Sequence, residues 1–256
     1  MRLLTYNIRE GGVGREEEIA EVIKAAKPDV VALQEATHPA SIERIARLAD
    51  FKYSGSKPSN STGFLSHVKV INYGWRHPPQ TRHALLEVVL ADGFPRLFVL
   101  HLRAWFSKWS ERQRARELRG LLDGISEQLK KENNAFAFHV LAGDFNALAP
   151  GEKFDTSPMP AWIRGMVWLS GRDIARSTIE MMKSDGYAEA WRTVHPDLEK
   201  EPGHTFPVWN PHTRLDYVFT PAPFASRFKA CEVRQTPDKV RTASDHFPLL
   251  VEISDS

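Results

Sequence analysis

Residues 140–147 read VLAGDFNA, in which a short apolar run ends at a glycine and is followed by Asp144 and Asn146. Continuous apolar runs of this length are typical of strands that are buried on both faces of a sheet. We therefore predict a strand over residues 136–142. The polar side chains just past its end are then expected at the rim of the sheet, where ligand sites often form.

The same pattern recurs in both directions along the chain. Polar residues lie beside apolar, strand-like runs at Asn7 (LTYNI, 4–8), Glu35 (VVALQE, 30–35), His101 (LHL, 100–102), Asp216 (RLDYVF, 214–219) and Asp245 with His246 (SDHFPL, 244–249). Taken singly, His101 is explained as a hydrogen-bonded core residue, and each of the others as a turn former, a helix cap or a surface charge. Their repetition at the ends of predicted strands instead indicates one shared polar site.

The acidic members of this set indicate its chemistry. They are Glu35, Asp144, Asp216 and Asp245. Carboxylates that are brought together repel one another and raise their own pKa values unless a cation neutralises them. Ligand sets made mainly of oxygen atoms favour Mg²⁺ or Mn²⁺ over zinc. Because Mg²⁺ also binds phosphate oxygens, the expected substrate is a phosphoester.

The spacing of apolar residues predicts both helices and strands. Helices are expected over 16–26, 40–49, 108–131 and 172–184. Strand-like pieces are expected over 3–8, 30–33, 62–73, 82–90, 95–102, 136–142, 215–219, 228–234 and 248–253. This order predicts an α+β fold in which helices cover stacked sheets. The stretch 147–170, which contains prolines and tryptophans, is expected to be an ordered excursion that contacts substrate.

The composition is that of an ordinary globular chain, with 256 residues, 42% hydrophobic residues and a formal net charge of +2. The length fits one domain over 1–256, and the charge is too small to predict polyanion binding by itself. The single cysteine, Cys231, excludes an internal disulfide and favours a reducing compartment, so we expect a cytoplasmic protein. The N-terminal apolar run is too short for a signal peptide, and no segment reaches the ~20 apolar residues of a membrane-spanning helix.

The six quoted segments, in this order and over nearly the whole chain, resemble the endonuclease/exonuclease/phosphatase superfamily. The resemblance implies a four-layered α/β/β/α sandwich, with two mostly antiparallel sheets flanked by helices. It also implies a divalent-metal-dependent phosphoester hydrolase, in which water attacks phosphorus. Abasic-site endonucleases, pancreatic-type deoxyribonucleases, neutral sphingomyelinases and inositol-polyphosphate phosphatases share this frame.

The resemblance also implies where the metal lies. Glu35 resembles the family's main metal-binding glutamate, and Asn7 resembles the asparagine beside the metal. Asp245 matches a position that completes the metal environment. The metal is expected to be Mg²⁺ or Mn²⁺.

Catalytic roles are implied in the same way. Asp144 resembles the aspartate that positions or deprotonates the attacking water, and Asn146 the asparagine that holds a phosphate oxygen. His246 resembles a histidine that pairs with an aspartate, here Asp216, and donates a hydrogen bond to the scissile phosphate. His101 resembles a histidine that some subfamilies place near the leaving group.

One position departs from the abasic-site endonucleases, because Arg9 stands where those enzymes carry an acidic residue. This residue argues against the abasic-site branch, and His101 favours the deoxyribonuclease and sphingomyelinase branches. Candidate substrate contacts are Arg103, His204 and Trp209, for which packing or a solvated surface position is the alternative.

The expected partner is a phosphoester: nucleic acid, a phospholipid head group or a small molecule. No stable protein partner is implied. Two alternatives to a general phosphodiesterase or phosphatase stay open, a nuclease acting on DNA or RNA and a non-catalytic module that binds a phosphate ligand. The sequence does not decide between one and two metals, or between endo and exo cleavage.

Overall fold

The computed structural model describes residues 1–58, 60–79, 81–91, 93–104, 108–132, 138–152, 157, 164–165, 176–197 and 199–254. Its strands form two six-stranded sheets. The first has the order β11-β12-β1-β2-β4-β3, made of β1 (Arg2–Asn7), β2 (Val30–Gln34), β3 (Tyr53–Gly55), β4 (Thr62–Ser66), β11 (Phe228–Val233) and β12 (Leu249–Ile253). The second has the order β5-β6-β7-β8-β10-β9, made of β5 (Val70–Arg76), β6 (Leu85–Leu90), β7 (Arg96–His101), β8 (His139–Asp144), β9 (Tyr187–Glu189) and β10 (Asp216–Pro221).

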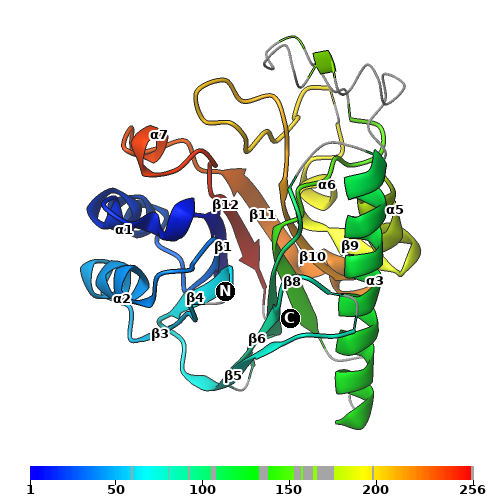
Figure 1. The fold of residues 1–256 in the computed structure, drawn as a ribbon, viewed down its shortest axis with the longest axis horizontal. Coiled ribbons are helices and arrows are strands. Elements are labelled where there is room, and N and C mark those ends of the chain that lie inside the picture. The colour runs from blue at the N-terminus through cyan, green and yellow to red at the C-terminus, as the bar shows by residue number, and fades with distance from the viewer. Residues whose placement is uncertain are drawn as a thin grey trace.

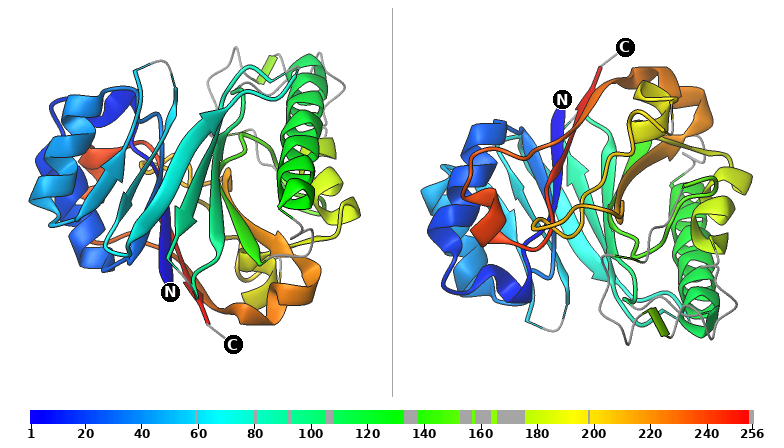
Figure 2. Two further views of the ribbon diagram at one scale, coloured as in Figure 1. Left: turned by 90° about the horizontal axis from the view of Figure 1, so that it is seen from below. Right: turned by 90° about the horizontal axis from the view of Figure 1, so that it is seen from above.

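Helices cover the outer face of each sheet (Figure 1). The first sheet carries α1 (Glu16–Ala26), α2 (Pro39–Leu48) and α7 (Val240–Ala243), and the second carries α3 (Lys108–Lys131) and α5 (Ser177–Ser184). Shorter elements are η1 (Glu10–Gly12), α6 (Ala190–Val194) and η2 (Ala222–Arg227). Figure 2 shows the sheets stacked between these helical layers, so the predicted four-layered α+β sandwich is confirmed. Within the described ranges, no helix combines the length and apolar composition needed to cross a bilayer.

The apolar runs of the sequence explain the stacking. Every residue of β2 is buried, and its side chains alternate between two cores. Val31 and Leu33 pack in the core beneath α1 and α2, whereas Val30 and Ala32 pack between the two sheets. A strand with a core on each face needs apolar side chains at every position, which is the pattern read from residues 30–33.

Several predicted boundaries differ from the structure. The strand-like region 62–73 is two strands, β4 and β5, which belong to different sheets. Helix α5 begins at Ser177 and strand β8 at His139, and the residues predicted before them, 172–175 and 136–137, lie outside the described residues. Most of the expected excursion 147–170 also lies outside them. The short elements β3, β9 and α6 were not predicted, because elements of three to five residues show no periodicity.

A parallel strand pair lies at the centre of each sheet. In the first sheet β1 runs parallel to β2, with Asn7 opposite Gln34. In the second β7 runs parallel to β8, with His101 opposite Asp144. Parallel neighbours end at the same edge of a sheet. The fold therefore places the polar residues at the ends of these strands along one rim.

Gly143 allows the close approach of β7 and β8. It lies opposite Leu100, and a Cβ built on Gly143 would overlap the backbone carbonyl of Leu100. Neither strand can yield, because both are buried and hydrogen-bonded within the sheet. The register that places Asp144 beside His101 thus requires glycine at this position.

We predict that Gly143→Ala lowers the free energy of unfolding by at least about 2 kcal/mol, because the added methyl group overlaps backbone that cannot relax. Gly74→Ala is the matched control, since Gly74 also lies in a strand, β5, but has no neighbouring atom near the Cβ position. Urea unfolding of the two variants measures the difference. Equal stabilities would show that the β7–β8 approach is not limiting.

Candidate active site

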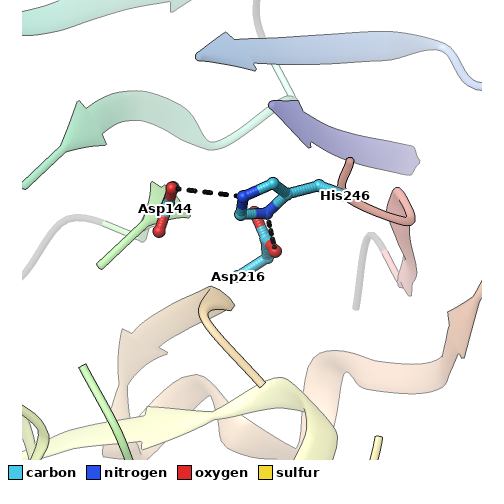
Figure 3. Close-up of side chains that lie close together, drawn as sticks. All are labelled: Asp144, Asp216 and His246. Carbon is cyan, nitrogen blue, oxygen red and sulfur yellow. Dashed lines mark hydrogen bonds and ion pairs between the residues drawn. The ribbon is translucent and has the colours of Figure 1, made fainter. Parts of the chain in front are cut away.

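Asp144, the last residue of β8, lies at the centre of the rim. Asp216 opens β10 and is its direct cross-strand neighbour in the second sheet. His246 precedes β12 of the first sheet and projects toward both carboxylates, as Figure 3 shows. Two carboxylates opposite each other on neighbouring strands repel. The imidazole of His246 supplies the opposing charge.

His246 and Asp216 form a tight buried pair. Nδ1 of His246 lies 2.9 Å from Oδ2 of Asp216, and Nε2 lies 3.9 Å from Oδ2 of Asp144. Burial opposes charging of the imidazole, but the neighbouring carboxylates, first of all Asp216, raise the pKa of His246 from 6.5 to about 10. His246 is therefore an imidazolium at neutral pH, which donates a hydrogen bond from Nδ1 to Asp216 and directs the N–H of Nε2 toward Asp144.

One carboxylate oxygen of Asp144, Oδ2, makes most of its polar contacts. Its Oδ2 accepts hydrogen bonds from Nδ2 of Asn7 (3.1 Å) and of Asn146 (3.0 Å). Nε2 of His101 lies 3.7 Å from the same oxygen. Burial raises the pKa of Asp144 from 3.8 to about 7, although His246 and the hydrogen bonds oppose this shift. A carboxylate with a pKa near neutrality is suited to accept a proton from water.

Asn7 and Glu35 lie on the other side of Asp144. Nδ2 of Asn7 donates to Oε1 of Glu35 at 3.2 Å as well as to Asp144. Glu35 follows β2 in the left-handed conformation (φ 57°), and its Oε2 accepts the backbone N–H of Glu10 at 2.6 Å. These hydrogen bonds offset the cost of a backbone conformation that non-glycine residues seldom adopt. The Glu35 side chain is thereby fixed at the rim.

Asp245 lies next to His246 at the edge of the same region. Its side chain is 22% exposed, and Oδ2 lies 3.9 Å from Nε of Arg9. Ser244 anchors this loop, because its hydroxyl donates to the backbone carbonyl of Asn7 at 2.7 Å. Asp245 is thus held close to β1 but keeps carboxylate oxygens accessible to solvent or to a ligand.

Asn146 supports Asp144 directly. It adopts a left-handed conformation (φ 50°), which asparagine tolerates better than most residues. Its backbone N–H donates to Oδ1 of Asp144 at 2.8 Å, and its Nδ2 donates to Oδ2 of Asp144 and to the carbonyl of Leu102. Both amide protons are therefore used. The predicted contact between Asn146 and a phosphate oxygen stays a prediction, and it requires one of these bonds to open.

His101, the last residue of β7, differs from His246 in charge. Burial lowers the pKa of His101 from 6.5 to about 4, and this effect outweighs the nearby carboxylate of Glu35. The ring is therefore neutral at pH 7. Its Nδ1 is buried and has no hydrogen-bond partner among the described residues. Nε2, which faces Asp144, is the nitrogen that can donate toward the site.

The three candidate substrate contacts lie outside this buried group. The guanidinium of Arg103 lies 5.9 Å from the ring centre of Trp109 at the start of α3. His204 is half-buried, and burial lowers its pKa. Trp209 is 67% exposed and contacts Phe206, whose ring centre lies 4.8 Å from that of His246.

Two residues beside the site were not singled out by the sequence. Phe206 packs on His246, and the ring of His83 stacks on His101 with 5.6 Å between centres. No local pattern marks either residue, because each contact joins segments far apart in the chain. A histidine before a strand and a phenylalanine in a loop are both ordinary.

Part of the acidic group has the spacing of a metal site. Among the described residues, Asp144, Asp216 and His246 form a group whose potential ligand atoms all lie within 4.8 Å of one another, and this group could hold a divalent ion. A protonated His246 has no free lone pair and is not a ligand, however. Asp216 Oδ1 is buried without a hydrogen-bond partner in the described part of the chain. Glu35 and Asp245 do not belong to this three-residue group.

Comparison with protein families agrees with this geometry. The model of the endonuclease/exonuclease/phosphatase family matches residues 4–246. The matched span includes every residue assigned to the rim. A comparison with curated protein sequences gives no match.

Solved structures resemble the whole chain at low sequence identity. An endonuclease/exonuclease/phosphatase protein from Beutenbergia cavernae is 22% identical with a TM-score of 0.70, over 99% of this chain and 72% of the other. An AP endonuclease from Archaeoglobus fulgidus is 20% identical with a TM-score of 0.69, over 99% of each chain. A 3′ phosphatase from Neisseria, bound to a product DNA hairpin, is 16% identical with a TM-score of 0.67, over 99% of each chain. At these identities the similarity establishes the fold.

We predict that Asp216→Asn returns the pKa of His246 toward its ordinary value, because the main opposing charge is lost. In the native metal-free protein, His246 binds a proton that the unfolded chain releases between the ordinary pKa of 6.5 and about 10. The stabilisation from this proton is complete below the lower value and is lost as pH rises through the upper one.

The variant should therefore lose less stability than the parent between about pH 6 and about pH 9. Urea unfolding at both pH values measures this, with Asp123→Asn, an exposed change on α3, as the control. Identical pH dependence in the parent and Asp216→Asn would contradict the charged pair.

Proposed function

We propose that this chain, which belongs to the endonuclease/exonuclease/phosphatase family, is a divalent-metal-dependent phosphoester hydrolase. The observation that carries the proposal is the surroundings of Asp144 Oδ2. Hydrogen-bond donors of Asn7 and Asn146 hold this oxygen, and ring nitrogens of His101 and His246 face it. The proton-accepting oxygen of Asp144 thus lies beside two imidazole donors.

The residues divide the chemistry between them. Asp144 orients a water molecule and accepts its proton, since burial places its pKa at about 7. The imidazolium of His246 donates a hydrogen bond to the phosphoryl oxygens, on which negative charge increases during attack. Asp216 keeps this imidazole oriented and charged. Neutral His101 donates from Nε2 on the leaving-group side.

The oxygen donors beside Asp144 fit a hard divalent cation. Glu35 and Asp245 are partly exposed, and together with water they supply the kind of carboxylate ligands that Mg²⁺ and Mn²⁺ accept. The side-chain amide of Asn7 donates a hydrogen bond to Glu35 and so orients its carboxylate. Asp216 Oδ1, which has no hydrogen-bond partner among the described residues, and the neighbouring carboxylate of Asp144 concentrate negative charge that a cation would relieve. When bound, the metal would polarise a phosphoryl oxygen.

Nucleic acid is the substrate class that a specific observation favours. Trp209 is 67% exposed, and Phe206 connects it to His246 through ring contacts. Exposed aromatic rings beside a phosphate site can stack on bases. A structural relative described above is bound to a DNA hairpin, which agrees with this candidate. A binding module without turnover is the remaining alternative, although it would have no need of the buried charges around Asp144.

The function is tested by a hydrolysis screen with Mg²⁺ or Mn²⁺ on bis(p-nitrophenyl) phosphate, p-nitrophenyl phosphate, plasmid and single-stranded DNA, RNA and sphingomyelin. We expect turnover of one class, and we expect Asp144→Asn and His246→Gln each to lower kcat roughly a hundredfold or more. Asp123→Asn, an exposed change on α3, controls for the effect of a substitution as such and should match the parent, whereas turnover by a contaminating nuclease would persist in Asp144→Asn and His246→Gln. Turnover that survives both substitutions, or no turnover by folded, metal-loaded protein, would remove the proposal.

The metal assignment has its own test. Glu35→Gln should weaken Mn²⁺ binding at least about tenfold, because a charged ligand becomes neutral with little change in shape. Calorimetric titration with MnCl₂ measures the affinity without any substrate. The control is Glu17→Gln on α1, whose side chain is 70% exposed. If both variants bind Mn²⁺ as the parent does, the metal does not bind at Glu35.

A further inference from the structure

His83 connects His101 to a helix that otherwise has no part in the site. The two imidazole rings are stacked, with 5.6 Å between centres and 18° between planes. His83 lies just before β6, and its side chain is 25% exposed, whereas that of His101 is 13% exposed. The ring of His83 therefore lies nearer the solvent than that of His101 and covers one of its faces.

Glu117 of α3 fixes His83 in this place. Its Oε1 accepts the backbone N–H groups of Arg82 (2.9 Å) and His83 (2.8 Å), and it lies 3.3 Å from Nδ1 of His83. The Glu117 side chain is only 4% exposed. Burial would raise the pKa of Glu117, but its bonds to His83 and Arg82 hold it below the ordinary value. The carboxylate is thus charged, and its position is set by three contacts.

A buried carboxylate is stable only when hydrogen bonds and an opposing charge compensate for lost hydration. The backbone N–H groups of Arg82 and His83 supply the hydrogen bonds, and Nδ1 of His83 faces the carboxylate at 3.3 Å. The helix therefore holds His83 by both its backbone and its ring. The orientation of that ring in turn restricts the ring of His101, whose Nδ1 has no hydrogen bond to fix it among the described residues.

We propose that His83, anchored by Glu117 on α3, is a positioning residue that keeps the His101 ring aligned with Asp144. The inference rests on the proposed function, since His101 matters as a donor to the reacting phosphate. A histidine that lacks a partner at Nδ1 needs another constraint on its ring, and the stacked face of His83 provides one. His83 itself touches no reacting atom.

The pair also acts on the charge of His101. Burial opposes protonation of the His101 ring, as do the imidazoles of His83 and His246, whereas the carboxylates of Glu35 and Asp216 favour it. Burial and the positive neighbours prevail, and the pKa of His101 is lowered to about 4. The imidazole of His83 thus contributes to the lowered pKa of His101.

Kinetics of the metal-loaded protein test the alignment. His83→Gln should lower kcat about tenfold with KM changed less than about twofold, because a misaligned donor affects the transition state more than binding. Glu117→Gln can still accept the backbone hydrogen bonds and should lower kcat in the same direction. Glu127→Gln, an exposed change on the same helix, is the matched control. Parental kcat in both His83→Gln and Glu117→Gln would overturn the proposal.

Nuclear magnetic resonance of the histidine ring nitrogens provides a test that needs no turnover. In metal-free protein at constant pH, His83→Gln and Glu117→Gln should each shift the ring-nitrogen resonances of His101, because the stacked ring is removed in the first variant and released from Glu117 in the second. Glu127→Gln should leave these resonances in place. Unchanged His101 resonances in both variants would overturn the inference, whereas an inactive parent with shifted resonances would overturn only the hydrolase proposal. Thermal unfolding of each variant excludes misfolding as the cause.

Discussion

A hydrogen bond of 3.1 Å joins Asn7 of the first sheet to Asp144 of the second. Each residue ends a central strand that runs parallel to a neighbour, so the bond links the two rims where strand ends gather. The same amide nitrogen also holds Glu35. One side chain thereby sets the distance between the carboxylate of Glu35, which we propose as a metal ligand, and that of Asp144, which we propose as the acceptor of the proton from water. The relative position of the two sheets therefore determines the relative position of the Glu35 and Asp144 carboxylates.

The electrostatics of the site follow from unequal surroundings of similar groups. His246 and His101 are both buried, yet their pKa values lie at about 10 and about 4. The difference arises because His246 pairs directly with Asp216, whereas His101 stacks on another imidazole. A site that needs both a charged donor and a neutral donor can obtain them from one residue type in this way. Because both rings are buried, a neighbouring charge shifts their pKa values more than it would in water.

The sequence predicts those parts of the molecule that depend on local pattern. Apolar runs such as residues 30–33 identified buried strands, and polar residues at their ends identified Asn7, Glu35 and Asp144. The split of residues 62–73 into strands of different sheets was not predicted, because both halves have strand-like composition and only packing separates them. His83 and Phe206 were missed for the same reason. Their contacts with His101 and His246 exist only after distant segments have packed together.

Buried charges away from the rim support the same arrangement. Arg214, fully buried two residues before Asp216, forms ion pairs with Glu152 and Glu189. Glu152 follows the loop that carries Asn146, and Glu189 ends β9. Such buried ion pairs add little net stability, since lost hydration offsets their attraction. They do allow few alternative geometries, because any shift would leave a charge unpaired in the interior. The start of β10 and the loop after β8 are therefore fixed relative to each other, which keeps Asp216 opposite Asp144.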